Sequence, residues 1–196
     1  HTKDSTSNNN DGTKKASNEP IQADGQIAKA QGFDGSDDYI DCGNDASLNI
    51  TDEITIEALV KPDVVNTWKR IASEGEWNTE WIFGISNTGK IDFSMKDVSG
   101  YTHTIYGNTT LSTGKWQYIV ATYSKSAGEV KLYLNDQSDR NPYDLSKSIA
   151  NSNINFNIGR SSNSYYFDGL IDEVRISNVA RSSAWIKASY NSLNDT

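Results

Sequence analysis

The sequence has little cysteine, no long apolar segment and no excess of positive charge. Cys42 is the single cysteine, which excludes an intramolecular disulfide and a metal site built from several cysteines. No apolar run approaches the roughly 20 residues that cross a bilayer, so we expect no membrane insertion. Acidic residues outnumber basic ones by 26 to 18, for a net charge of −8, and this balance argues against nucleic acid as a partner.

Helical periodicity is nearly absent, and short apolar or alternating segments take its place. Residues 116–124 are apolar on both faces, as expected of a central strand covered on both sides. Residues 181–190 give the one helical signal, with Ser182 or Ser183 as the N-cap. The pattern predicts an all-β, two-sheet antiparallel sandwich of the jelly-roll type with one short C-terminal helix. The other expected strands lie within 54–61, 69–75, 81–86, 90–96, 129–135 and 155–160.

The chain has the length of one domain, and we expect residues 1–196 to form a single domain. Residues 1–25 are polar throughout, which predicts an N-terminal arm or surface loop packed on that domain. The chain begins at His1 rather than Met, which indicates a piece of a longer protein with further domains.

The segment 167–178, FDGLIDEVRISN, places a carboxylate in an unexpected position. Strict alternation puts Asp172 on the same face as Val174 and Ile176, which we expect to be the core face. A buried carboxylate is costly unless backbone N–H groups, an arginine or a cation compensate its charge. Asp172 is therefore a candidate site residue.

Three segments together resemble one family. They are DSTSNNNDGT (4–13), AKAQGFDGSDDYIDCG (28–43) and FDGLIDEVRISNVARSSAWI (167–186), and the resemblance is to the laminin-G-like group of concanavalin A-like jelly-roll domains. The family occurs in large secreted or surface proteins of bacteria and archaea. The resemblance implies two curved antiparallel sheets, a carbohydrate- or protein-binding role and, in many members, a structural calcium. The family's usual strand before the first signature is missing, apart from His1.

A calcium site is the first hypothesis, because calcium binds hard oxygen ligands from carboxylates, amides and carbonyls. Asp38 shares a face with Ile40 and Cys42, so we expect it, like Asp172, to point inward. One ion would join the N-terminal arm to the last strand. The alternative is that these side chains accept backbone N–H groups in turns. The candidate ligands are Asp4, Asn10, Asp34, Asp38 and Asp172.

A carbohydrate-binding surface is the second hypothesis. Sugar rings stack on exposed aromatic rings, while polar neighbours bind the hydroxyl groups. The alternative for each ring is packing in or beside the core. The candidates lie in or beside loops and are Trp77, Trp81, Tyr106, Tyr165 and Tyr166.

Catalysis has no recognisable basis in the sequence. Jelly-roll glycanases commonly carry two carboxylates in a Glu-x-Asp-x-x-Glu strand, and the nearest pairs, among Glu74, Glu76 and Glu80, do not match that pattern. His103 has no partner motif. We therefore expect a non-catalytic module of an extracellular or surface protein, with a glycan as its partner. An adhesion or spacer domain that contacts a cell-surface protein is the alternative, and a glycan-active enzyme comes third.

Overall fold

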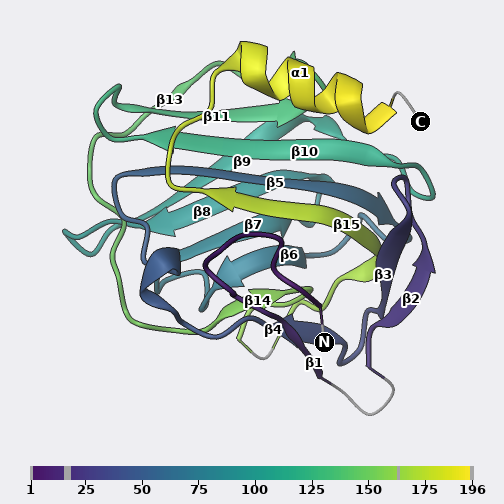
Figure 1. Ribbon diagram of the computed structural model, residues 1–196. Helices are drawn as coiled ribbons and strands as arrows, with labels where there is room; N and C mark the ends of the chain where they lie inside the picture. The colour runs from purple at the N-terminus through teal and green to yellow at the C-terminus, as the bar shows by residue number, and fades with distance from the viewer. Residues whose placement is uncertain (1, 16–18, 163, 195–196) are drawn as a thin grey trace.

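The computed structural model describes residues 2–15, 19–162 and 164–194, which form two antiparallel sheets packed face to face (Figure 1). The seven-stranded sheet has the order β1 (Thr13–Lys15), β4 (Tyr39–Asp41), β14 (Phe156–Ile158), β6 (Lys69–Glu74), β7 (Trp81–Ile85), β8 (Lys90–Lys96) and β9 (Thr102–Thr110). The eight-stranded sheet has the order β12 (Gln137–Ser138), β11 (Glu129–Leu134), β10 (Gln117–Ser124), β5 (Glu53–Pro62), β15 (Asp168–Ser177), β3 (Lys29–Asp34) and β2 (Ile21–Asp24), with β13 (Tyr143–Asp144) beside β11. The predicted all-β sandwich is confirmed.

The main core lies between the two sheets and follows from the alternation of the strands. Ile56 and Val60 on β5 point inward, and Phe83 on β7 and Phe93 on β8 meet them from the other sheet. Each of these side chains is fully buried, so the inner faces of the strands account for the principal hydrophobic cluster.

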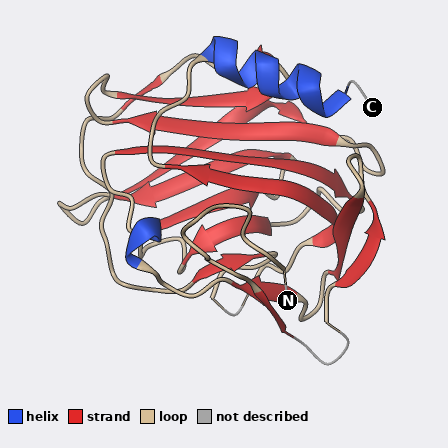
Figure 2. Cartoon of the chain, viewed as in Figure 1, coloured by secondary structure: helices blue, strands red, loops and turns tan. Residues whose placement is uncertain are grey.

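Helix α1 (Ser183–Asn194) covers the outer face of the eight-stranded sheet, across β10 and β11 (Figures 1 and 2). Ser182 caps the helix, because its hydroxyl oxygen accepts the Trp185 N–H at 3.3 Å. Ile186 and Leu193 pack on apolar side chains of β5, β10 and β11. This cover explains why β10 is apolar on both faces. Within the described part of the chain, no helix is long and apolar enough to cross a membrane.

A β-bulge in β15 changes which side chains face the core. Asp172 pairs with Leu59 of β5, but Arg175 pairs with Glu57, so β15 carries one extra residue at this point. Glu173, inside the bulge, has a φ of 50°. The extra residue switches the alternation, because Ile171 faces the core before the bulge and Val174 and Ile176 pack against it afterwards.

The prediction that Asp172 faces the core is therefore wrong. Leu59, its partner in the register, belongs to the apolar cluster beneath helix α1, on the outer face of the sheet. Asp172 is nonetheless buried, near the turn that precedes β3.

The polar N-terminal segment also differs from its prediction as an arm or loop. Residues 13–15 form β1 and pair with β4, and residues 21–24 form β2 and pair with β3. Each sheet thus receives one edge strand from this segment. Thr2 and Gly12 close the loop before β1 through two backbone hydrogen bonds of 2.9 and 2.8 Å. His1, the residue left from the family's usual first strand, lies outside the described residues.

Candidate functional site

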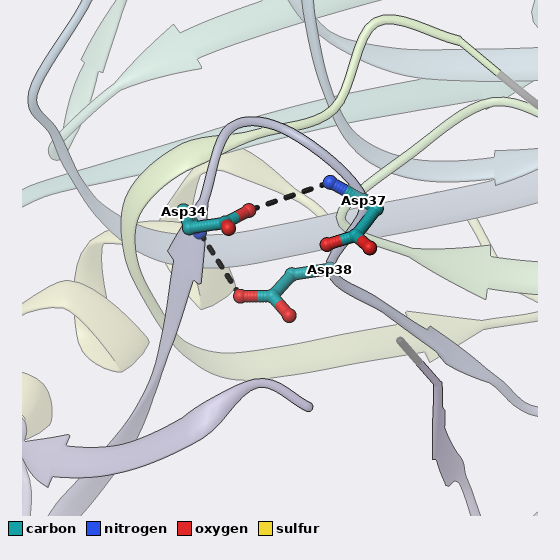
Figure 3. A group of neighbouring side chains, drawn as sticks. All are labelled: Asp34, Asp37 and Asp38. Atoms are coloured by element: carbon teal, nitrogen blue, oxygen red, sulfur yellow. Dashed lines mark hydrogen bonds between the residues drawn. The ribbon is translucent and has the colours of Figure 1, made fainter. Parts of the chain in front are cut away.

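Three aspartates meet at the turn between β3 and β4 (Figure 3). Asp34 ends β3, Gly35 turns the chain with a φ of +76°, and Asp38 precedes β4. One carboxylate oxygen each of Asp34, Asp37 and Asp38 lies within 4.8 Å of the other two. The Asp34 N–H donates to Asp38 Oδ2 at 3.1 Å, so the turn holds the carboxylates close together.

Asp38 is the buried member of this acidic turn. The residue is 4% exposed, and its Oδ1 has no hydrogen-bond partner among the described residues. Burial raises the pKa of the Asp38 carboxyl group, and the charges of Asp34 and Asp37 raise it further. A buried acceptor without a donor is costly, so this oxygen is suited to a ligand that the protein chain does not supply.

A fourth carboxylate lies beside the turn. Asp168, the first residue of β15, is the direct cross-strand partner of Asp34. A Cβ atom on Gly35 would lie 2.9 Å from the Asp168 side chain, so the two strands approach closely here. Like charges directly opposite each other destabilise a strand pair. Among the described residues none of these four aspartates forms a salt bridge, so the excess negative charge favours a cation.

The other predicted metal ligands lie elsewhere. Asp4 accepts the Asn10 N–H at 2.9 Å, and the Asn10 amide donates to Ser47 at 3.0 Å, in the loop before β1. The Asp172 carboxylate accepts the N–H groups of Ile27 at 3.2 Å and of Glu173 at 2.9 Å. Backbone N–H groups thus compensate its charge.

The five predicted ligands are not brought together around one ion. Asp34 and Asp38 are neighbours, but Asp172 lies four residues beyond Asp168 along β15, about 13 Å at the usual rise per residue. The structure adds Asp37, which the sequence analysis did not select although it is adjacent to Asp38.

The second candidate site lies on the outer face of the seven-stranded sheet. Arg70, Gly84, Asp92 and Tyr106 follow one another across β6, β7, β8 and β9 in register. Arg70 Nη1 donates to Asp92 Oδ2 at 2.7 Å, and both side chains are buried. Gly84 places no side chain between them, and a Cβ atom there would lie 2.1 Å from the Lys69 carbonyl oxygen.

Aromatic rings enclose the Arg70 guanidinium group. Its carbon atom lies 5.1 Å from the Trp68 ring and 5.2 Å from the Tyr165 ring, and the Trp68 and Tyr106 rings are 6.1 Å apart. Cation–π contacts of this kind hold the rings in place. Burial raises the pKa of Asp92, and Arg70 opposes that increase.

A chain of hydrogen bonds joins this centre to Trp77. The Trp77 indole N–H donates to Thr104 Oγ1 at 3.1 Å, and Ser94 Oγ lies 3.1 Å from Thr104 Oγ1 and 3.0 Å from Asp92 Oδ1. We name the group of Trp68, Arg70, Trp77, Asp92, Thr104, Tyr106 and Tyr165 the aromatic face. Its most exposed rings are those of Trp77, Tyr165 and Tyr106, at 53%, 46% and 39%.

Trp81 does not belong to this surface, and its prediction as a ligand-binding residue is wrong. It is 1% exposed, its ring packs 5.8 Å from that of Phe156, and its indole N–H donates to Glu74 Oε2 at 2.7 Å. Tyr166 is half-buried beside Tyr165. No sequence motif singles out Arg70 and Asp92, although alternation with Ile91 and Phe93 places Asp92 on the outer face.

His103 has partners that the sequence did not indicate. Its Nε2 lies 3.0 Å from Asp97 Oδ2, and its Nδ1 lies 3.4 Å from the Tyr143 hydroxyl group. A histidine–aspartate pair orients an imidazole for proton transfer, but it needs a nucleophile or a substrate group in reach. Tyr143 supplies a hydroxyl group beside the imidazole, and its ring packs edge-on against it with 6.2 Å between the ring centroids.

Several solved structures that resemble this chain are binding domains. The binding domain of Paraclostridial Mosquitocidal Protein 1 matches with a TM-score of 0.80 and 17% identity, over 97% of this chain and 49% of that one. The botulinum neurotoxin serotype G binding domain matches with a TM-score of 0.75 and 16% identity, over 96% and 47%. The chain thus spans about half the length of these toxin domains.

A third structure is a domain of a glycan-active enzyme. Domain 4 of AbnA, a GH43 extracellular arabinanase from Geobacillus stearothermophilus solved with arabinotriose, matches with a TM-score of 0.68 and 21% identity, over 86% of this chain and 80% of that one. No curated protein sequence is significantly similar to the chain. The family model of the concanavalin A-like lectin/glucanases superfamily matches residues 34–187. The chain therefore belongs to the laminin-G-like family of this superfamily.

Proposed function

We propose that this chain is a non-catalytic carbohydrate-binding module of a larger extracellular or cell-surface protein. The observation that carries the proposal is the aromatic face, which presents three exposed rings around residues linked to a buried ion pair. Aromatic rings stack on the C–H faces of sugars, and nearby hydroxyl groups bind the sugar hydroxyls. The arabinanase domain solved with arabinotriose gives independent support, because it shares the fold.

The chemistry of the face favours a neutral glycan. Arg70, its cation, is buried, and its Nη1 is paired with Asp92, although its buried Nε has no hydrogen-bond partner among the described residues. It therefore positions the rings of Trp68 and Tyr165 and exposes little positive charge. The groups left for a ligand are the rings of Trp77, Tyr106 and Tyr165. A neutral oligosaccharide matches these groups better than an acidic one does.

A broad glycan array tests the proposal with the intact chain and three variants. Trp77→Ala and Tyr165→Ala are expected to lower the affinity for any bound glycan at least tenfold, or about 1.4 kcal/mol. Tyr101→Ala is the matched control, because Tyr101 is 72% exposed on the turn between β8 and β9. A folded protein that binds no glycan would contradict the proposal. Binding to a cell-surface protein in its place would support an adhesion or spacer domain.

We also propose that Asp34, Asp37 and Asp38 hold a structural calcium ion. Calcium takes six to eight oxygen ligands, and this turn offers three carboxylates, one with a buried oxygen that lacks a partner. The ion would neutralise the like charges across the pair of β3 and β15. It is a different set of ligands from the one that the sequence suggested, since Asp4, Asn10 and Asp172 are elsewhere.

Thermal unfolding in EDTA and in excess calcium tests this site. Binding to the folded state alone stabilises by about 2.7 kcal/mol at a hundred times Kd. Asp37→Ala is expected to remove this increment, whereas Asp24→Ala, an exposed aspartate paired with Lys29, retains it. If the unmodified chain unfolds at the same temperature in EDTA and in excess calcium, the site is excluded.

A further inference from the structure

Two buried glutamates flank the loop that carries Trp77. Glu74 is the last residue of β6, Glu80 directly precedes β7, and residues 75–79 form the loop between them. Glu74 is 3% exposed and Glu80 is 2% exposed, although Trp77 in the same loop is the most exposed ring of the aromatic face. The two carboxyl groups therefore lie at the base of the loop, inside the protein.

The carboxyl groups of Glu74 and Glu80 lie within hydrogen-bonding reach of each other, and each has a second partner. The Trp81 indole N–H donates to Glu74 Oε2 at 2.7 Å, and the Ser152 backbone N–H donates to Glu80 Oε1. The hydrogen bond between the two carboxyl groups requires a proton on one of them, because two carboxylates have no donor. With that proton the pair carries one negative charge rather than two.

The loop above this pair is tight, and it contacts both β9 and the segment that precedes Tyr165. Gly75 has a φ of +88°, and a Cβ atom on it would lie 2.2 Å from Thr79 Oγ1. Trp77 contacts Thr104 on β9 through its indole N–H. The Gly75 carbonyl oxygen accepts the Ser162 N–H at 3.4 Å, close to Tyr165 in the chain. A change at the base of the loop would thus reach Trp77 within the loop and Ser162 through Gly75.

We propose that Glu74 and Glu80 form a proton-dependent clasp that fixes the Trp77 loop and thereby positions Trp77 for its ligand. With one shared proton the clasp is closed. When the proton dissociates, two buried negative charges face each other, their hydrogen bond is lost, and the base of the loop opens. Only the effect on ligand binding rests on the function proposed above, because the clasp itself is a property of the unliganded chain.

The surroundings place this transition in the weakly alkaline range. Burial and the charge of Glu80 raise the pKa of Glu74 to about 8. Trp81 on β7 and Phe156 on β14 bring no charge to the pair, and neither do residues 150–154. Lys96 on β8 contacts Glu80 through its backbone N–H, which donates to the Glu80 carbonyl oxygen at 2.7 Å. Glu80 is thus the titratable neighbour of Glu74 in these contacts.

Nuclear magnetic resonance of the indole N–H groups tests the clasp without any ligand. Between pH 6 and 9.5 the signals of Trp77 and Trp81 are expected to shift together, with a midpoint near pH 8. Glu74→Gln removes the group that titrates and is expected to abolish the shared transition. Glu80→Gln removes the neighbouring charge but not the burial of Glu74, and is expected to move the midpoint below pH 8. Glu76→Gln, which changes the same charge within the loop but outside the pair, retains the transition.

Two results would overturn the clasp. One is the absence of any transition of Trp77 in the folded unmodified chain, which decides the matter even where a variant does not fold. The other is an unchanged transition in a folded Glu74→Gln protein. Because no glycan is present in either experiment, a failure of carbohydrate binding does not affect this outcome.

Discussion

At the scale of single residues, the buried pair of Arg70 and Asp92 organises the aromatic face. The desolvation of two charges offsets much of their attraction, so such a pair adds little net stability. Its structural effect is clear, because the guanidinium group contacts the rings of both Trp68 and Tyr165. Arg70 therefore connects the interior of β6 to the surface that we propose binds glycan.

Removing one partner of this pair is expected to cost more than removing both. Arg70→Ala leaves a buried, unpaired Asp92 and should lower the free energy of unfolding by about 3–5 kcal/mol. The double variant Arg70→Met with Asp92→Leu should recover most of that loss, because it buries no charge. Urea unfolding of the two variants checks this order, and a double variant less stable than the single one would contradict it.

Glu74 should make stability depend on pH. Its pKa in the folded chain is about 8, against an ordinary value of 4.5, so the folded state holds the proton more tightly than the unfolded state. The resulting stabilisation is complete below pH 4.5 and disappears as the pH rises through 8, by up to about 5 kcal/mol. Urea unfolding between pH 5 and 9 should show this decline in the unmodified chain and a flatter profile for Glu74→Gln. Equal slopes would refute it.

Trp77 and Trp81, near Glu74, show how far the exposure of a single side chain can be predicted from its sequence neighbours. Alternation places Trp81 on the same face as Phe83 in the strand 81–86, which already indicates burial, so its prediction as a sugar-binding residue neglected the available signal. The pairing of Arg70 with Asp92 has no local signal, because it depends on the register of three strands. The exposed position of Trp77 was predictable from its polar neighbours.

At the scale of elements, the bulge in β15 is the feature that sequence periodicity could not reveal. One extra residue reverses the inward and outward faces, and nothing in the composition of 167–178 marks its position. The prediction of a strand in an antiparallel sheet was correct for this segment. The orientation of Asp172 failed for this reason alone.

The left-handed conformation of Glu173 gives a direct test of the bulge. Glu173→Gly is expected to be neutral or mildly stabilising, because glycine adopts a positive φ without steric cost. Glu173→Val should destabilise by about 1–2 kcal/mol, because a β-branched residue tolerates this conformation poorly. Glu173→Gln, which removes only the charge facing Arg175, supplies the reference for both. Thermal unfolding should rank the three, and equal stability of the valine and glycine variants would argue against a strained bulge.

At the scale of the whole molecule, hairpins such as β6 to β9 alternate with neighbours that are far apart in the sequence. β14 pairs with β4 and β6, and β15 pairs with β3 and β5. Local patterns predicted most of the long strands, although not β9, and the two-sheet class, and the resemblance of 4–13, 28–43 and 167–186 predicted the family. The strand order and the meeting of the acidic turn with Asp168 depend on long-range packing, which local patterns do not contain.

This topology predicts slow folding. Pairings between distant segments require large loops to close before any contact is gained. Refolding from urea, followed by stopped-flow fluorescence, is expected in the range from milliseconds to seconds. A dominant microsecond phase with full amplitude would contradict the prediction.

The position of β15 also affects how the protein is made. The strand is the last in the sequence, yet it lies between β5 and β3 near the middle of the eight-stranded sheet (Figure 1). A chain leaving the ribosome from its N-terminus cannot complete that sheet until residue 177 has emerged. The residues before Asp168 must wait with the edges of β5 and β3 unpaired, so synthesis and folding are separated in time. Chaperones that hold unfolded chains can act on this domain during that interval.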